Sequence, residues 1–384
     1  MITITILYII LALLLFGVLI FVHELGHYIA ARACGVKVLE FSIGMGPTLV
    51  KWQSKKTDIK YSLRALPVGG FCAMEGENEL DEDGKEIESE EDKDPRSYKN
   101  KPAWMKIIIL VAGPLMNIIL GVLMTVVLVV GSRGEDGKII IATNTVADFT
   151  ENAISLETGL MANDTVVKVG NVNIHTGAEL AYEISIQGKK TEKYTQHVGE
   201  NGEETVERDV VSLDLTVIRD GKEIELKGVK FLASVAEGSV FGSTDFRVYR
   251  DGKVTFLDIV KNSWYRSLNS VKMVWDSLVG LLGGRFALSS VSGPVGTTQV
   301  ITQAASAGWY NLLYIFVVIS MNLGVFNLIP ILPLDGGHVV FAVYELIARK
   351  PAPRKLREAC QLVGVALMFG LMIAVTIKDV IKLF

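Results

Sequence analysis

Four stretches of the chain are long and apolar enough to cross the hydrocarbon core of a bilayer, which takes about 20 residues in helix. They are residues 2–22, 107–131, 309–334 and the shorter stretch 359–377. A cleaved signal peptide is the alternative for the first, but no basic residue precedes its apolar run and no small-residue cleavage site ends it. The pattern therefore predicts a polytopic α-helical membrane protein with about four transmembrane helices.

The connection between the first two spans has two parts. Residues 56–74 hold short alternating apolar runs interrupted by Pro67, Gly69 and Gly70, which is typical of strands joined by a tight turn. Residues 75–94 are almost entirely acidic and polar, without an aromatic residue. We expect a solvated linker there.

The long connection between the second and third spans predicts a small domain of mixed strand and helix. Strands are expected at 138–143, 165–172, 213–219 and 223–227, a short helix at 179–187, and a polar loop at 189–209. The pair Asp220-Gly221 between the last two strands is a strong hairpin signal. Apolar residues then recur at helical spacing over 256–282, with tryptophan and tyrosine among them. This helix is expected to pack on the protein or to lie at the membrane surface.

Charge sets the expected orientation and argues against one kind of partner. Half of the residues are hydrophobic, and 38 basic residues stand against 42 acidic ones, so nothing suggests a nucleic-acid partner.

Basic residues gather in the connections after the first and third spans, and such loops stay cytoplasmic. They are Arg32, Lys37, Lys51, Lys55, Lys56, Lys60, Arg64, Arg349, Lys350, Arg354, Lys355 and Arg357. Residues 132–307 and both termini are therefore expected outside the cytoplasm.

The sequence HELGH at residues 23–27, which continues the first apolar run, is typical of zinc hydrolases. In a helix, His23 and His27 lie on one face and can bind one Zn²⁺, while Glu24 lies near the water that the metal activates. An accidental pattern is the alternative, but ionisable groups within a span cost roughly 2.5–3.5 kcal/mol and are functional by default. Gly26 weakens a helix by about 1 kcal/mol relative to alanine, so we expect another helix or the substrate to approach it closely.

A catalytic zinc site usually has three protein ligands, and Asp335 is the best candidate for the third. It is the only acidic residue near the end of the third span, within NLIPILPLDGG at residues 327–337. The prolines and the glycine pair break regular helix, which is tolerated at membrane depth only where the backbone faces protein or a cavity. On the sequence alone, the alternative that Asp335 caps a following helix stays open.

These paired motifs resemble those of the site-2 protease family of intramembrane zinc metalloproteases, peptidase family M50, in its bacterial RseP/RasP-like branch. Supporting matches follow in order along the chain. They are GMGP at 44–47, PVGGF at 67–71, GPLMN at 113–117 and SGPVG at 292–296. The resemblance therefore covers nearly the whole sequence.

The resemblance implies roles for individual residues. His23, His27 and Asp335 would bind Zn²⁺, and Glu24 would be the catalytic base. Asn327 is implied as a further catalytic residue that steadies the developing oxyanion.

Two further elements are implied to contact the substrate. One is Asn117, for which an ordinary interhelical hydrogen bond is the alternative, as it is for Asn327. The other is the hairpin through Gly69, Gly70 and Phe71, which resembles the family's membrane-dipping β-element and would pair with an unwound substrate as an added strand.

The outer domain resembles a PDZ domain, through ETGL at 157–160, ND at 163–164 and the strand that ends in VG at 169–170. Bacterial members often carry two such domains, whereas this chain has room for one. The fold class implied is a polytopic α-helical membrane protein with a cytoplasmic membrane-associated β-hairpin and one extracytoplasmic PDZ-like α+β domain. The expected parts are a first transmembrane helix (1–32), the hairpin region and acidic linker (33–102), a second transmembrane helix (103–131), the PDZ-like domain (138–235), an amphipathic helix and connector (236–307), a third transmembrane segment (308–337), and a cytoplasmic loop with the fourth transmembrane helix (338–384).

The implied function is cleavage of single-span membrane proteins within their spans, in the bacterial plasma membrane, after another protease has shortened their outer part. Anti-sigma factors and remnant signal peptides are the expected substrates, and the lipid bilayer is the other partner. A metal transporter is one alternative, but outside the two motifs the four spans carry no charged residue. A PDZ scaffold with a vestigial metal site is another, but it would have no need of Glu24.

Overall fold

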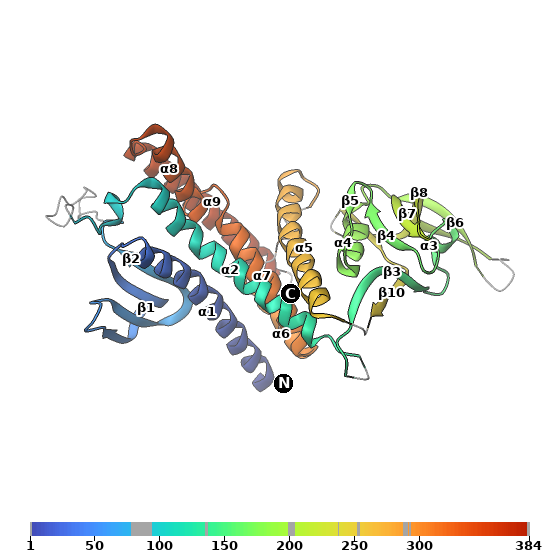
Figure 1. The fold of residues 1–384 in the computed structure, drawn as a ribbon, viewed down its shortest axis with the longest axis horizontal. Coiled ribbons are helices and arrows are strands. Elements are labelled where there is room, and N and C mark those ends of the chain that lie inside the picture. The colour runs from blue at the N-terminus through green and yellow to red at the C-terminus, as the bar shows by residue number, and fades with distance from the viewer. Residues whose placement is uncertain are drawn as a thin grey trace. The chain divides into compact units, whose positions relative to one another are not determined.

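The structure is a computed structural model (Figure 1) and describes residues 2–77, 94–134, 137–198, 204–236, 238–251, 254–286, 291 and 293–381. The chain forms two compact units. Met1–Met124 together with Ser292–Phe384 make the first, and Thr125–Val291 make the second. Residues 78–93, which make up most of the acidic linker predicted at 75–94, lie outside the described residues.

Among the described residues, four helices are long and apolar enough to cross a membrane, as the sequence predicts. They are α1 (Ile2–Ala33), α2 (Ala103–Gly131), α7 (Trp309–Asn327) and α9 (Arg354–Ile381). Their apolar cores span 24, 29, 19 and 26 residues, which is enough for the roughly 20 residues that a bilayer requires. The chain is therefore a polytopic membrane protein with an additional β-sheet domain.

The third span ends in an irregular segment, as the sequence predicts. Within the apolar run 309–334, the helix α7 ends at Asn327, where the proline-containing motif begins. Pro330 and Pro333 have no backbone N–H to continue the helical hydrogen bonds, and proline also disfavours helix at the residue before it. A separate helix, α8 (Asp335–Ala348), begins directly after this irregular segment, although the sequence predicts a cytoplasmic loop from residue 338 onward.

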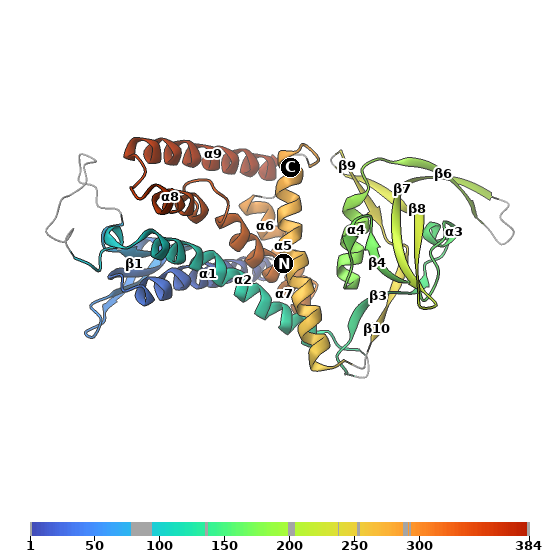
Figure 2. The same cartoon turned by 45° about the horizontal axis from the view of Figure 1, so that its top comes forward.

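A two-stranded antiparallel sheet packs against α1, as both views show (Figures 1 and 2). It consists of β1 (Val38–Gln53) and β2 (Lys60–Met74), and the short helix η2 (Tyr98–Asn100) precedes α2. The strands bend so strongly that Phe41 pairs with both Tyr61 and Cys72. The prediction of a tight turn at Pro67–Gly70 is wrong, because β2 runs through these residues and the turn falls at 54–59 instead. The shared core of sheet and helices is Ala30, Ala31, Val36, Val38, Phe41, Ile59, Cys72, Met74 and Ile109.

Close contacts hold the helices of this unit together. A side chain at Gly26 of α1 would overlap the backbone of Ala112 in α2, which confirms the expected close approach of another helix. Further along, Asp379 of α9 accepts hydrogen bonds at 2.8 Å from the backbone N–H groups of Gly293 and Gly296, at the start of α6 (Pro294–Ser306). Figure 2 shows α9 running past α6 in this arrangement.

The second unit is built on an eight-stranded sheet. Its main path has the order β10-β3-β4-β7-β8-β9, with β5 paired to β4 and β6 paired to β7. The elements are β3 (Ile141–Phe149), α3 (Ile154–Glu157), β4 (Thr165–Val169), β5 (Val172–Asn173), α4 (Gly177–Gln187), β6 (Glu192–Val198), β7 (Glu204–Arg219), β8 (Lys222–Ala236), β9 (Ser239–Ser243), β10 (Phe246–Asp251) and α5 (Phe256–Leu282). Its core includes Leu180, Val217 and Phe231, none of which is exposed.

Most of the predicted elements of this unit are confirmed, and one is wrong. The helices at 179–187 and 256–282 are α4 and α5, and Asp220-Gly221 forms the hairpin turn between β7 and β8 with positive φ at both residues. The polar stretch 189–209 is not a loop, because β6 and the start of β7 pair there from Glu192 with Val210 to Val198 with Glu204. Backbone pairing defines this ribbon, and its largely polar side chains give no hydrophobic alternation to detect.

The helix α5 has two different faces. One face contacts the domain through Lys272, whose Nζ donates to Glu183 at 2.7 Å, and through Tyr265, which stacks on His175 at 3.8 Å. A neighbouring face carries exposed apolar residues. They are Phe256, Leu257, Val260, Trp264, Leu268, Trp275, Val279 and Leu282. Packing of α5 on the protein is therefore confirmed, and its contact with the membrane surface stays a prediction.

Candidate metal centre

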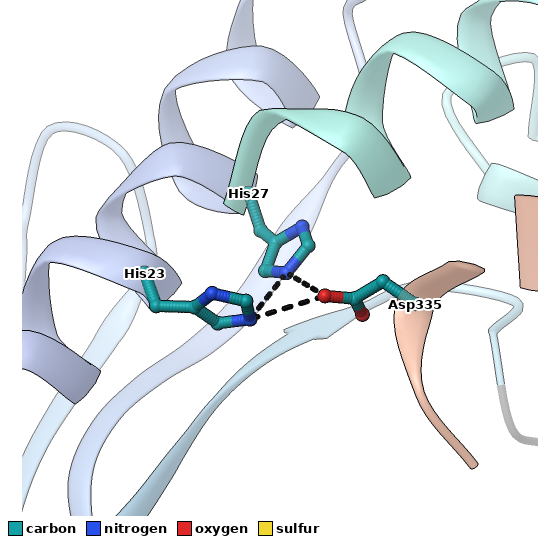
Figure 3. Close-up of side chains that lie close together, drawn as sticks. All are labelled: His23, His27 and Asp335. Atoms are coloured by element: carbon teal, nitrogen blue, oxygen red, sulfur yellow. Dashed lines mark hydrogen bonds and ion pairs between the residues drawn. The ribbon is translucent and has the colours of Figure 1, made fainter. Parts of the chain in front are cut away.

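Three side chains from distant parts of the chain meet at one point (Figure 3). His23 and His27 project from adjacent turns of α1, and Asp335 approaches from the start of α8. Asp335 Oδ2 lies 3.1 Å from Nε2 of His23 and 3.5 Å from Nε2 of His27, and the two Nε2 atoms are 3.3 Å apart. The structure thus brings together the three residues that the sequence suggests as ligands.

The spacing of these three atoms fits a zinc ion. Tetrahedral ligands at zinc–nitrogen and zinc–oxygen distances of about 2.0–2.2 Å stand about 3.3–3.6 Å from one another. The three measured distances lie within a few tenths of an ångström of this range. Two imidazoles and one carboxylate also leave the fourth position of a tetrahedron open, as catalytic zinc sites require.

The backbone around Asp335 directs its carboxylate toward the histidines. The N-cap of α8 is Leu334, and no side chain caps the helix, so the alternative that Asp335 serves as a cap is wrong. The turn before α8 is tight, because any side chain at Gly336 would overlap the carbonyl oxygens of Leu328 and Ile329. The carboxylate therefore stands at the end of a closely folded arm.

The position of His27 is fixed by α2. Its Nδ1 lies 2.8 Å from the carbonyl oxygen of Ile109, which can only accept, so Nδ1 carries the proton and Nε2 offers its lone pair. Gly113 of α2 lies against the same imidazole, where a Cβ would sit 2.6 Å from Cε1 and 2.8 Å from Cδ2. Neither contact could be predicted from the sequence, because every residue has a backbone carbonyl and a glycine within an apolar helix can serve many purposes.

The position of His23 is set by Asn117. This asparagine has no exposed surface, and its Nδ2 lies 3.3 Å from Nδ1 of His23. The hydroxyl of Ser320 on α7 donates to the backbone carbonyl of Asn117 at 2.7 Å. Asn117 is therefore held at the point where α1, α2 and α7 meet.

Glu24 lies on α1 between the two histidines and beside the sheet. A Cβ added to Gly70 of β2 would lie 3.1 Å from Cγ of Glu24 and 2.9 Å from the carbonyl oxygen of Ser42. The strand thus passes close to Glu24 at a position without a side chain. The side chain of Glu24 therefore lies against the backbone of β2.

The remaining predicted site residues are less closely connected to the three ligands. Phe71 pairs with Ser42 in the sheet, and its ring lies 4.9 Å from the guanidinium of Arg64. Gly69 has a left-handed backbone, with φ of 81°, beside the side chain of Met45. Asn327 is the last residue of α7 and is half-buried, and within the described part of the chain its side chain makes no hydrogen bond to the ligands.

Comparison with known proteins agrees with this geometry. The sequence model of peptidase family M50 matches residues 11–371. A protein of Clostridium acetobutylicum whose name assigns it to the zinc metalloproteases is 33% identical over 373 residues, which cover 97% of this chain and 97% of that protein. The zinc metalloprotease RasP of Shouchella clausii is 28% identical over an alignment of 442 positions, which covers 96% of this chain and 98% of that protein. The regulator of sigma-W protease RasP of Bacillus subtilis is 27% identical over an alignment of 447 positions, which covers 97% of this chain and 98% of that protein.

The match extends along nearly the whole chain and includes both motifs that supply the three clustered side chains. The relatives are zinc metalloproteases by name, and the spacing of the clustered atoms suits zinc. This chain is accordingly a metalloprotease that uses Zn²⁺, and it belongs to peptidase family M50, the site-2 protease family.

Proposed function

We propose that this protein cleaves single-span membrane proteins within their transmembrane segments, with His23, His27 and Asp335 as the zinc ligands and Glu24 as the general base. The observation that supports it most is the tetrahedral spacing of the three ligand atoms, two of which belong to a membrane-spanning helix. Both histidines are buried, so the chemistry would take place away from bulk water.

The proposed reaction is hydrolysis of a peptide bond. When bound, zinc supplies Lewis-acid activation of the attacking water and of the scissile carbonyl. Glu24 takes the proton from that water and passes it to the departing amine, which is general acid–base catalysis by one carboxylate. Asn327, at the end of α7, is proposed to donate to the oxygen on which negative charge develops.

Presentation of the substrate is proposed to depend on β2. The carbonyls of a transmembrane helix are already hydrogen-bonded, so the helix must unwind before hydrolysis. An unwound segment could then pair with the strand through Gly69, Gly70 and Phe71, which supplies main-chain hydrogen bonds without selecting a sequence. The support is the close approach of Gly70 to Glu24, which would place such a strand near the base.

The second unit is proposed to be a PDZ-like domain outside the cytoplasm. A hollow with a volume of about 820 Å³ lies between α4 and the edge strand β10, and Leu180, Phe246 and Val248 line it. An edge strand beside a helix is the arrangement in which a peptide binds as an added strand. The alternative is that the domain binds no peptide and only keeps bulky substrates away from the site. The basic residues in the connections after the first and third spans support a plasma-membrane protein with both termini outside the cytoplasm.

The proposed substrates are anti-sigma factors or remnant signal peptides that another protease has already shortened. The name of the Bacillus subtilis relative, regulator of sigma-W protease, supports the first of these. Membership of a peptidase family favours the protease over a metal transporter or a scaffold with a vestigial metal site.

The test is cleavage of a tagged single-span substrate in membranes by the wild type and by Glu24→Gln. This variant removes the base and keeps all three ligands, so we expect zinc to stay bound and cleavage to be lost. Equal cleavage by both forms would contradict the role of Glu24. Absence of cleavage in the zinc-loaded wild type, across several single-span substrates, would contradict the proposed activity.

A further inference from the structure

Asn117 makes contacts that its implied role in substrate binding does not account for. It is fully buried on α2, and its amide lies against Nδ1 of His23 at 3.3 Å. Its Oδ1 is buried as well and has no hydrogen-bond partner among the residues that the structure describes. Half a turn of this amide would pair Oδ1 with His23 and leave Nδ2 unpaired instead, so the position of the proton on His23 decides which end of the amide faces the ring.

The two histidines need protons on the same ring atom if both bind one metal through Nε2. His27 already has its Nδ1 proton directed to the carbonyl oxygen of Ile109, at 2.8 Å. For His23, the corresponding Nδ1 proton needs an acceptor, and the amide of Asn117 is the group that lies there. A half-turn of this amide exchanges Nδ2 and Oδ1, so that the oxygen accepts that proton and Nδ2 takes the unpaired position.

We propose that Asn117 is a positioning residue for the zinc site and that it serves His23 in both states of the protein. With zinc bound, Oδ1 accepts the proton on Nδ1 of His23 and so keeps Nε2 free to bind the metal. Without zinc, Nε2 carries the proton toward Asp335, 3.1 Å away, and Nδ2 of the asparagine donates to Nδ1. This inference rests on the proposed assignment of His23 as a ligand.

The surroundings of Asn117 suit this role. The bond from Ser320 to its backbone carbonyl holds α2 in place at this residue while leaving the amide free to turn. A carboxamide offers a donor and an acceptor side by side, which neither leucine nor an ionised carboxylate does. Groups that bond to the second ring nitrogen of a metal-binding histidine fix its orientation, and their loss typically costs 10- to 100-fold in metal affinity.

Two substitutions separate this role from simple packing between helices. Asn117→Asp keeps an acceptor for the Nδ1 proton, as in the carboxylate–histidine–zinc arrangement, whereas Asn117→Leu keeps the volume and removes the acceptor. We expect Asn117→Leu to bind zinc about 10- to 100-fold more weakly and Asn117→Asp to bind at least as tightly as the wild type. If Asn117 only fills space, the order reverses, because leucine packs well and a buried carboxylate is costly.

The measurement is zinc affinity of the full-length protein in detergent, by competition with a fluorescent chelator after the metal has been removed. Gly370→Ala is the control, because a Cβ at this position of α9 would have no heavy atom within 4 Å, so its affinity should equal that of the wild type. His23→Ala and Asp335→Ala test the ligands themselves. If these two bind zinc normally, the proposed function fails, whereas wild-type affinity in Asn117→Leu overturns only the role of Asn117.

A second measurement needs no substitution at Asn117 and therefore does not depend on whether the variants fold. The chain has five histidines, so ¹⁵N-labelled histidine gives few signals to assign. In the zinc-loaded wild type we expect His23 to show a protonated Nδ1 and a metal-bound Nε2. Metal bound through Nδ1, or an unprotonated Nδ1, would overturn the proposal.

Discussion

Gly113 offers a sharp test of how tightly the site is built, because it leaves space for the imidazole of His27. In Gly113→Ala, the new Cβ would overlap Nε2 of that ring, the proposed metal-binding atom, and would lie 2.6 Å and 2.8 Å from its Cε1 and Cδ2 atoms. Ordinary contact begins at about 3.5 Å, so the ring or α2 would have to move by roughly 1 Å. The substitution should thus displace one of the proposed zinc ligands.

Two energies oppose each other in this variant. Alanine favours a helix over glycine by about 1 kcal/mol, which would stabilise α2. Overpacking of a well-packed contact costs typically 1–3 kcal/mol, and displacement of a catalytic group by about 1 Å can reduce the rate roughly 100-fold. We therefore expect a small change in thermal stability together with a loss of activity and zinc affinity.

The assay compares zinc affinity and substrate cleavage of Gly113→Ala with those of Gly370→Ala. Gly370 lies in α9, where a Cβ would have no heavy atom within 4 Å, so this control makes the same substitution in a span without crowding the site. The control should match the wild type. If Gly113→Ala keeps wild-type affinity and cleavage, the packing of Gly113 on His27 is not what positions this ligand.

Three further predictions concern other parts of the chain. Phe231→Ala should destabilise the second unit by about 3–5 kcal/mol in thermal unfolding and leave zinc affinity unchanged, because the ligands belong to the other unit. Lys106→Met should lower thermal stability because it leaves Glu345, 2.9 Å away, without its cation, and the double variant with Glu345→Met should recover part of the loss. Burial opposes the charge of Lys272, but hydrogen bonds from its ammonium to two carboxylates raise its pKa. Its ion pairs should therefore stabilise the second unit fully below about pH 10 and less as pH rises further, and Lys272→Met should abolish this dependence in melting curves.

The proposed ligands could be predicted from the sequence because their chemistry is unusual for their surroundings. Two histidines four residues apart at the end of an apolar run are costly in lipid unless they serve a purpose such as metal binding, and Asp335 is the only carboxylate near the end of the third span. What supports these residues could not be predicted in the same way. Gly113 and the carbonyl of Ile109 act through shape and backbone geometry, which become visible only when α1 and α2 are placed side by side.

The errors in the predicted fold also have physical reasons. Pro67, Gly69 and Gly70 are residue types that usually mark a turn, so the turn was predicted there, whereas β2 runs through them and the turn falls at 54–59. The ribbon of β6 and β7 has largely polar side chains, so no alternation distinguished it from a loop. Long helices and the Asp220-Gly221 turn were predicted correctly because each rests on a strong local signal.

The most direct test of the central claim is the zinc content of the purified full-length protein and its variants. The account predicts one zinc per chain in the wild type and in Glu24→Gln, and loss of the metal from His23→Ala, His27→Ala and Asp335→Ala. Retention of zinc by Asp335→Ala would contradict the assignment of the third ligand. Retention by all three ligand variants would show that the metal binds elsewhere and that the proposed centre is not the zinc site.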